Sequence, residues 1–149
     1  MPKRSYLRQA SLSPEQRTRL EIIIKPDYEG EEVRRIAEYE GVKKRTARAY
    51  LNTLISRLLA GSAFHAVCNA LKRGDVSSDV SEERVKKLTS LELGILKHIY
   101  PEYNLDLAAH SLGVSRGVIE SGLKEICGTL GVYNQAQLAP YSHYAHSRP

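Results

Sequence analysis

The chain has 149 residues, a length that allows one ordinary domain or two small ones. Hydrophobic residues make up 42% of it and charged residues 26%, a balance that excludes a disordered or fibrous protein. The formal net charge of +5 is uneven: residues 1–76 carry 15 basic and 9 acidic side chains, whereas residues 77–149 carry 7 and 8. A basic half favours a polyanion such as nucleic acid, although a membrane surface or solubility alone would also fit.

The two cysteines, Cys68 and Cys127, are far apart and have no metal or redox spacing. We expect two buried thiols in a reducing compartment rather than a disulfide or a zinc site. The basic N-terminus, MPKRSYLRQA, precedes no apolar stretch, so we expect no secretion, no membrane span and a cytoplasmic protein. His143 and His146 lack further ligands, and no catalytic or phosphate-binding pattern is present. We therefore expect neither an enzyme nor a cofactor.

The first half has the pattern of four helices. Ser13 with Gln16 three residues later forms a predicted capping box, and Pro14 suits the first helical position. Gly41 is placed to end a second helix, because glycine readily takes the left-handed cap. Apolar residues at helical spacing predict the remaining helices of this half. The second, third and fourth helices are expected at 31–40, 44–58 and 62–72.

The second half repeats the first. The triplet Pro26, Asp27, Tyr28 returns as Pro101, Glu102, Tyr103, 75 residues later. After that loop the matching offset is 72 residues, and Gly113 takes the place of Gly41. Thr89 with Glu92 repeats the capping box. The corresponding second, third and fourth helices are expected at 105–112, around 116–130 and at 134–141.

The repeat predicts an all-α fold of two tandem four-helix helix-turn-helix domains joined by a short linker. The first domain covers residues 1–74 and is basic, and the second covers 88–149. Residues 75–87 are rich in serine and mixed charge, which is typical of a linker, with some helix expected toward Leu88. The final SHYAHSRP has no periodicity and is expected to be a frayed tail.

The second half resembles the LuxR/GerE-type DNA-binding domain, and the first half is similar to it. The residues that carry the resemblance in the second half are Leu88, Thr89, Glu92, Leu96, Ala108, Ala109, Leu112, Gly113, Val114, Ser115, Leu130, Gly131, Val132, Asn134, Ala136 and Leu138. The first half departs from the family at Leu59 and Ala60, which replace a usual Gly and Val, and at Lys43, which replaces a Ser cap. The resemblance implies a prokaryotic or phage origin, and a third helix that enters the major groove of DNA.

In the first half that helix begins with KKRTAR. Lys44, Arg48 and Asn52 are four residues apart and form one stripe. Arg and Asn can hydrogen-bond to guanine and adenine edges, and Lys can neutralise phosphates; a solvated basic face is the alternative. The predicted DNA-binding residues of this half are Lys43, Lys44, Arg45, Thr46, Arg48, Tyr50 and Asn52.

In the second half the predicted DNA-binding residues are Ser115, Arg116, Ser121 and Lys124. Glu120 lies on the same stripe, where its carboxylate repels phosphate, and we expect it to pair with the cations on either side of it. Gly117 and Gly122 are expected to weaken the helix. This half is therefore expected to bind DNA weakly or to serve mainly in protein interaction.

The sequence thus predicts a sequence-specific regulator of transcription that binds double-stranded DNA. The alternative is an adaptor that binds RNA polymerase or a second regulator and contacts DNA only weakly. Family members commonly dimerise, often through the fourth helix. The tandem copies either form a pseudo-dimer within one chain or pair as a homodimer, and the sequence leaves both open.

Overall fold

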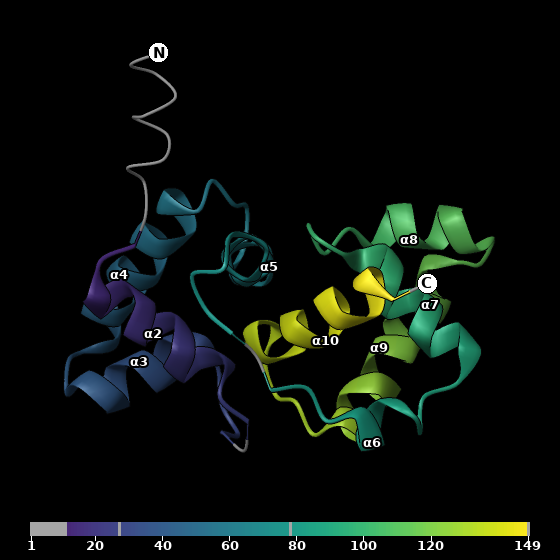
Figure 1. Cartoon of the computed structure of the whole chain (residues 1–149), viewed down its shortest axis with the longest axis horizontal. Helices are drawn as coiled ribbons and strands as arrows, with labels where there is room; N and C mark the ends of the chain where they lie inside the picture. Colours follow the sequence, from purple (N-terminus) through teal and green to yellow (C-terminus); the bar gives the residue numbers. More distant parts are fainter. Residues whose placement is uncertain (1–11, 27, 78, 149) are drawn as a thin grey trace, which may run out of the picture.

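The computed structural model describes residues 12–26, 28–77 and 79–148, and these segments contain helices and no strand (Figure 1). The prediction of an all-α protein is confirmed for this part of the chain. The helices are α2 (Pro14–Ile24), α3 (Glu32–Glu40), α4 (Lys44–Arg57), α5 (Ala63–Arg73), α6 (Glu82–Val85), α7 (Ser90–Ile99), α8 (Leu105–Leu112), α9 (Arg116–Leu130) and α10 (Gln135–Ser147). Within the described ranges, no helix combines the length and the apolar character needed to cross a membrane.

Both predicted capping boxes are confirmed. At the start of α2, the Gln16 backbone N–H donates to Ser13 Oγ and the Ser13 N–H donates to Gln16 Oε1, at 3.2 and 2.9 Å. Thr89 and Glu92 exchange the same pair of bonds at the start of α7, at 3.1 and 2.8 Å. These bonds satisfy amide groups that the first helical turn leaves without partners.

Two helix pairs are joined by short turns that contain a left-handed glycine. Gly41 ends α3 with φ 66°, and Gly113 ends α8 with φ 67°. The next helix, α4 or α9, starts three residues later and packs on its predecessor. The predicted glycine stops are confirmed at both places, because a side chain would resist this backbone conformation.

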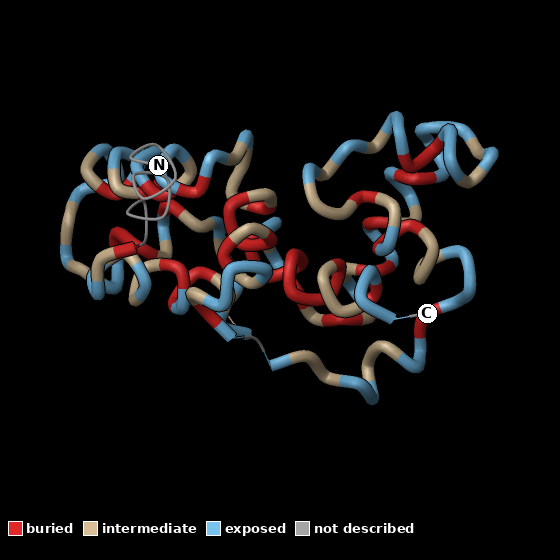
Figure 2. The backbone as a smooth tube through the Cα atoms, turned by 45° about the horizontal axis from the view of Figure 1, so that its top comes forward, coloured by how far each residue is buried: buried red, intermediate tan, exposed pale blue. Residues whose placement is uncertain are grey.

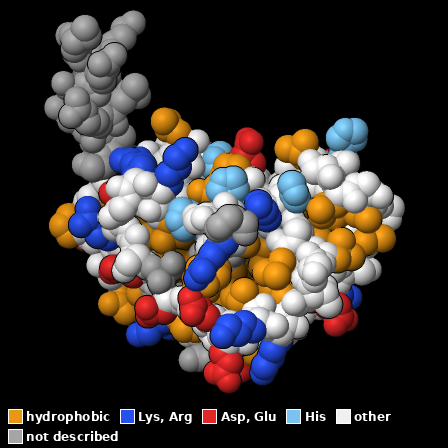
Figure 3. All heavy atoms as spheres, turned by 45° about the vertical axis from the view of Figure 1, so that its right-hand side comes forward, with side chains coloured by type: hydrophobic (Ala, Val, Ile, Leu, Met, Phe, Trp, Pro, Cys, Tyr) orange, Lys and Arg blue, Asp and Glu red, His pale blue; other side chains and the backbone are white. Residues whose placement is uncertain are grey.

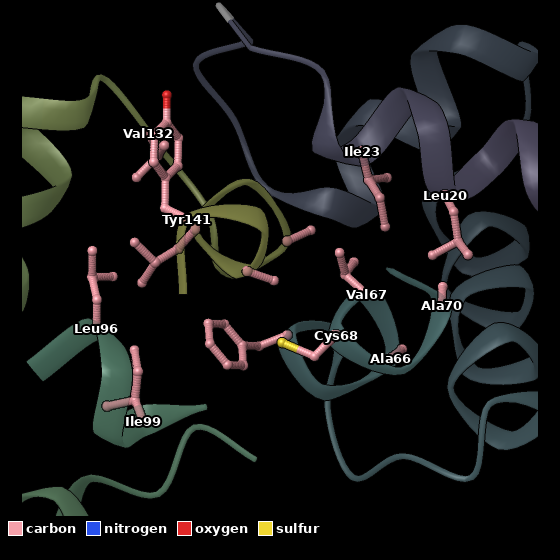
Figure 4. Packing of buried hydrophobic residues seen from close by; sticks show 14 of the residues in the cluster. Leu20, Ile23, Ala66, Val67, Cys68, Ala70, Leu96, Ile99, Val132 and Tyr141 are labelled. Atoms are coloured by element: carbon pink, nitrogen blue, oxygen red, sulfur yellow. The ribbon is translucent and has the colours of Figure 1, made fainter. Parts of the chain in front are cut away.

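Helices α5 and α10 lie next to each other in the middle of the molecule (Figure 1). Most of their residues are buried, as the tube in Figure 2 shows. Figure 4 shows Val67 and Cys68 of α5 between Ile23 of α2 on one side and Tyr141 of α10 on the other. Phe64 of α5 meets Tyr103 edge-on, with ring centroids 5.0 Å apart. The hydrophobic core is therefore continuous from one half of the chain to the other.

The expected linker is partly helical, since α6 lies within it. Asp75, at its start, is ion-paired with Arg73 at 3.4 Å and with Arg17 at 4.0 Å. The side chain of Arg84 reaches the C-terminal end of α9, where it donates to the Leu130 carbonyl oxygen at 2.8 Å. The segment thus follows the surface of both halves.

The expectation of a frayed C-terminal tail is wrong, because α10 continues through Pro140 to Ser147. Tertiary contacts hold this extension in place. Ser142 is fully buried and donates to the Leu96 carbonyl oxygen at 2.6 Å, and Tyr144 donates to Glu82 at 2.8 Å. The tail has little periodicity in sequence because α7 and α6 contact it on different sides.

The two cysteines are free. Cys68 is fully buried as expected, whereas Cys127 is only half-buried, which corrects the prediction for that residue. Burial raises the pKa of both thiols above its ordinary value. Both side chains are therefore protonated and unreactive near neutral pH.

Candidate nucleic-acid interface

Helix α4 presents four basic side chains at its N-terminal end. The inner face of the helix consists of Ala47, Leu51 and Leu54, which are buried in the core and hold the helix in place. The exposed basic residues at the N-terminal end of α4, called here the basic cluster, are Lys43, Lys44, Arg45 and Arg48. The core contacts thus determine which way the basic cluster faces.

Within the described part of the chain, no ion pair or hydrogen bond engages a side chain of the basic cluster. The first turn of α4 has no acidic residue, and its N-cap, Lys43, makes no side-chain capping bond. The amide groups of that turn and the positive end of the helix dipole therefore add to the field of the cations. This end of α4 attracts anions.

The outward face of α4 is broader than the stripe predicted from the sequence. Asn52 is exposed as expected, and so are Ala49, Thr53 and Ser56. With 100° between successive residues, these three lie at the centre of the face opposite Ala47, and Lys44 lies on its flank. These three carry no charge and were not among the predicted DNA-binding residues, although helical periodicity alone places them on the outer face.

Two predicted DNA-binding residues of α4 are half-buried, Thr46 and Tyr50. The Tyr50 ring lies under the guanidinium of Arg19, 3.9 Å from the ring centroid. Arg19 is in turn bound to Glu40 of α3 at 2.6 Å, and this hydrogen bond raises the pKa of Arg19. Tyr50 therefore joins α4 to α2 and α3, which corrects its expected place on the DNA-facing surface.

In the second half, α9 takes the place of α4, and one of its two cationic side chains, Arg116, is ion-paired. Ser115 is the N-cap and accepts from the Val118 N–H at 3.3 Å. Arg116 binds Asp106 of α8 at 3.0 Å and Glu120 at 3.5 Å. The predicted Arg116–Glu120 pair is confirmed, whereas the pair with Asp106 was not foreseen. Hydrogen bonding to Asp106 raises the pKa of Arg116.

Ser121 and Lys124 are exposed on α9 as well. Lys124 has no ion-pair partner among residues 12–148 as far as they are described, and it is therefore available to an anion. The charge of Arg116 is offset by the carboxylates of Asp106 and Glu120. The positive field around α9 is therefore much weaker than that around α4.

The contact between Arg19 and Tyr50 has a counterpart in the second half. Counted from the caps Ser13 and Thr89, Arg19 corresponds to Ile95, and at the 72-residue offset Tyr50 corresponds to Gly122. A Cβ atom added to Gly122 would lie 2.5 Å from Ile95 Cδ1. Equivalent positions are thus in contact in the two halves, but their side chains differ in size. Arg packs on Tyr in the first half, and Ile packs on Gly in the second.

The two histidines predicted not to bind metal flank one tyrosine. Tyr100 Oη lies 3.1 Å from His143 Nδ1, and the Tyr100 ring stacks on His146 with centroids 4.3 Å apart. Burial lowers the pKa of His143, and the neighbouring His146 lowers it further. These rings fasten the end of α10 to α7.

No protein-family model, no curated protein and no solved structure matches this chain. The meaning of these two surfaces must therefore be argued from their own charge and geometry.

Proposed function

We propose that the protein is a sequence-specific regulator of transcription that binds double-stranded DNA. In this proposal the chain is a tandem of two helix-turn-helix units similar to LuxR/GerE-type domains, with α3–α4 and α8–α9 as the paired helices. The basic cluster carries the proposal. Four exposed cations at one helix end, facing no carboxylate of the described chain, provide the field that a phosphate backbone requires.

Helix α4 would enter the major groove with its exposed face toward the base edges. Arg48 can bind O6 and N7 of guanine through two hydrogen bonds, and Asn52 can do the same with adenine. Lys43, Lys44 and Arg45 lie at the start of the helix, where side chains meet the phosphates that border the groove. Phosphate contacts set the position of the helix, and the two outward polar side chains supply sequence preference.

The packing of α5 against α10 supports a pseudo-dimer within one chain rather than a homodimer. These are the fourth helices of the two units, which are often the dimer interface in the LuxR/GerE family. Here each already covers the other, and the buried residues Ala66, Cys68 and Ala139 leave no such surface for a second chain. Because α4 presents four cations without an ion-pair partner in the described chain and α9 presents only Lys124, we expect a DNA site with one dominant half.

A second function, that of an adaptor, is favoured by one observation on α9. Arg116 is neutralised by Asp106 and Glu120, so this half is poorly suited to DNA. An adaptor would bind RNA polymerase or a second regulator, and its basic cluster would make only weak, nonspecific DNA contacts.

Selection of bound sequences from a random pool of duplex DNA, with the full chain, tests the proposal. We expect one enriched motif whose affinity falls by orders of magnitude between about 50 and 200 mM salt, because several phosphate contacts release counterions. Weak binding of all sequences with no enriched motif would instead support the adaptor. No binding to any duplex at the lower salt concentration would contradict the proposal.

A further inference from the structure

A shallow hollow lies on the second half, between the start of α7 and one side of α9. Its lining includes Leu91, Glu92, Gly117, Val118, Gly122 and Glu125. Gly117 adds no side chain to the hollow, and at Gly122 the buried Ile95 occupies the place that a side chain would take. We call this surface the α7–α9 hollow.

Large apolar side chains are exposed at this surface. Leu91 is 43% exposed and Val118 is 39% exposed, and Leu107 on the adjoining α8 is 54% exposed. Figure 3, which turns the right-hand side of Figure 1 forward, shows several hydrophobic side chains at the surface among charged and polar ones. Apolar side chains grouped on a surface in this way mark an interaction site more often than single exposed ones do.

The charge of the hollow is negative. Glu92 and Glu125 line it, and its lining includes no Lys or Arg. One Glu92 oxygen accepts the Thr89 N–H as part of the helix cap, whereas Glu125 is exposed and has no ion-pair partner among the described residues. Helical spacing places Arg116 and Lys124 on the other flank of α9.

The same helical face has the opposite character in the first half. At the 72-residue offset, Arg45 becomes Gly117, Thr46 becomes Val118 and Tyr50 becomes Gly122. The substitutions remove a cation, add an apolar side chain and replace a tyrosine ring by a glycine against which Ile95 packs. These changes weaken the attraction for a DNA backbone, because a cation is lost and the Glu125 carboxylate repels phosphate.

We propose that the α7–α9 hollow binds a protein segment in which a large apolar side chain is flanked by Lys or Arg. The apolar side chain would pack between Leu91 and Val118, and the cations would meet Glu125, which lines the hollow. This inference rests on the proposed function in one respect: it treats α9 as the counterpart of the DNA-binding helix α4. The protein would then hold DNA with one half and a basic protein segment with the other.

The test uses the full chain and random 12-residue peptides displayed on phage, followed by a labelled synthetic copy of the most enriched peptide. We expect enriched peptides to contain Leu, Ile, Phe or Met beside Lys or Arg. Val118→Lys places a cation in the hollow and should lower the affinity of the protein for the synthetic peptide by about tenfold or more. Tyr133→Lys is the matched control, because it exchanges another exposed apolar side chain of the same half and should leave the affinity unchanged.

Three results would overturn the inference. The first is a peptide selection that does not fit the hollow: acidic peptides are enriched, or no peptide is enriched. The same holds if the Val118→Lys variant binds the enriched peptide as tightly as the original protein does. The second is a loss of DNA affinity in Val118→Lys as large as that in Arg48→Ala, which would assign the hollow to DNA. The third is a concentration-dependent dimer that Val118→Lys abolishes, which would make a second copy the occupant.

The two proposals fail separately in these measurements. If the duplex selection finds no motif while basic peptides still bind in a Val118-dependent way, only the DNA proposal fails. If the DNA motif is found and no peptide is enriched, only the proposal that the hollow binds a basic protein segment fails. Melting curves of each variant, followed by circular dichroism, show whether a lost affinity reflects a lost fold.

Discussion

The Gln137 side chain of α10 donates a hydrogen bond from Nε2 to the Lys25 carbonyl oxygen at 2.9 Å, across 112 residues of sequence. The same nitrogen donates to the Tyr28 carbonyl oxygen at 3.1 Å, and Gln137 Oε1 accepts the Tyr133 N–H at 2.6 Å. Gln137 is only 2% exposed. One buried amide thus joins the second half to the loop that leads into α3.

Two neighbours extend this junction. Asn134 Nδ2 donates to the Gly30 carbonyl oxygen at 2.9 Å, and the Ala136 N–H donates to Glu32 Oε2 at 3.0 Å. The start of α10 therefore holds the segment between α2 and α3 at several points. Through α3, this junction contributes to the placement of α4, the helix proposed to bind DNA.

Gln137→Ala should destabilise the protein by about 2–3 kcal/mol, because it removes three part-buried hydrogen bonds, two to the Lys25 and Tyr28 carbonyl oxygens and one from the Tyr133 N–H. Urea unfolding measures the change in the free energy of unfolding. Gln135→Ala is the control, since Gln135 is exposed on the same helix and should change the free energy by less than about 0.5 kcal/mol. Equal effects of the two substitutions would show that the junction does not contribute to stability.

Arg48→Ala should weaken binding to the preferred DNA site by about 1–3 kcal/mol and relax the preference at one base pair. Lys44→Ala should weaken binding to all sequences alike and reduce the salt dependence by about one phosphate contact. Fluorescence anisotropy with matched and mutated duplexes at several salt concentrations separates the two effects. Small and equal losses from both substitutions would leave α4 without a role in the groove.

The glycines of α9 should respond to alanine in opposite directions. Gly122→Ala should destabilise the protein by about 1–3 kcal/mol, because the new Cβ collides with the buried Ile95. Gly128→Ala meets no atom within 4 Å and should stabilise the helix by about 0.5–1 kcal/mol. Thermal melts of the two variants provide the comparison. A stabilising Gly122→Ala would show that α7 and α9 are not as close as described.

His143 should make stability depend on pH. Its pKa is lowered in the folded protein, first by burial and then by His146, whereas in the unfolded chain it has its ordinary value near 6.5. As pH falls through about 6.5, the unfolded state takes up this proton before the folded state does, so the contribution present at higher pH is lost. The free energy of unfolding between pH 7.5 and 5 should fall more steeply in the original protein than in His143→Gln. Parallel curves would contradict this assignment.

Local features of the sequence predicted most of the helices correctly. The two capping boxes, Gly41, Gly113 and the apolar spacing of α4 each act within a few residues of chain, and the structure has helices where these features predict them. The exposed positions of the basic cluster were also predictable, because the buried Ala47, Leu51 and Leu54 leave only one side of α4 for charge. The function of that cluster remains a prediction.

Contacts between distant segments decided the rest. The half-buried position of Tyr50 depends on Arg19, the ion-paired state of Arg116 depends on Asp106, and the ordered end of α10 depends on Leu96 and Glu82. The sequence by itself determined which stretches are helical, where they begin and end except at the end of α10, and that two halves repeat, because caps, glycines and hydrophobic periodicity act locally. Only the tertiary structure decided that α5 and α10 pack together and which charged side chains are already paired, because such partners are chosen by three-dimensional proximity and not by spacing along the chain.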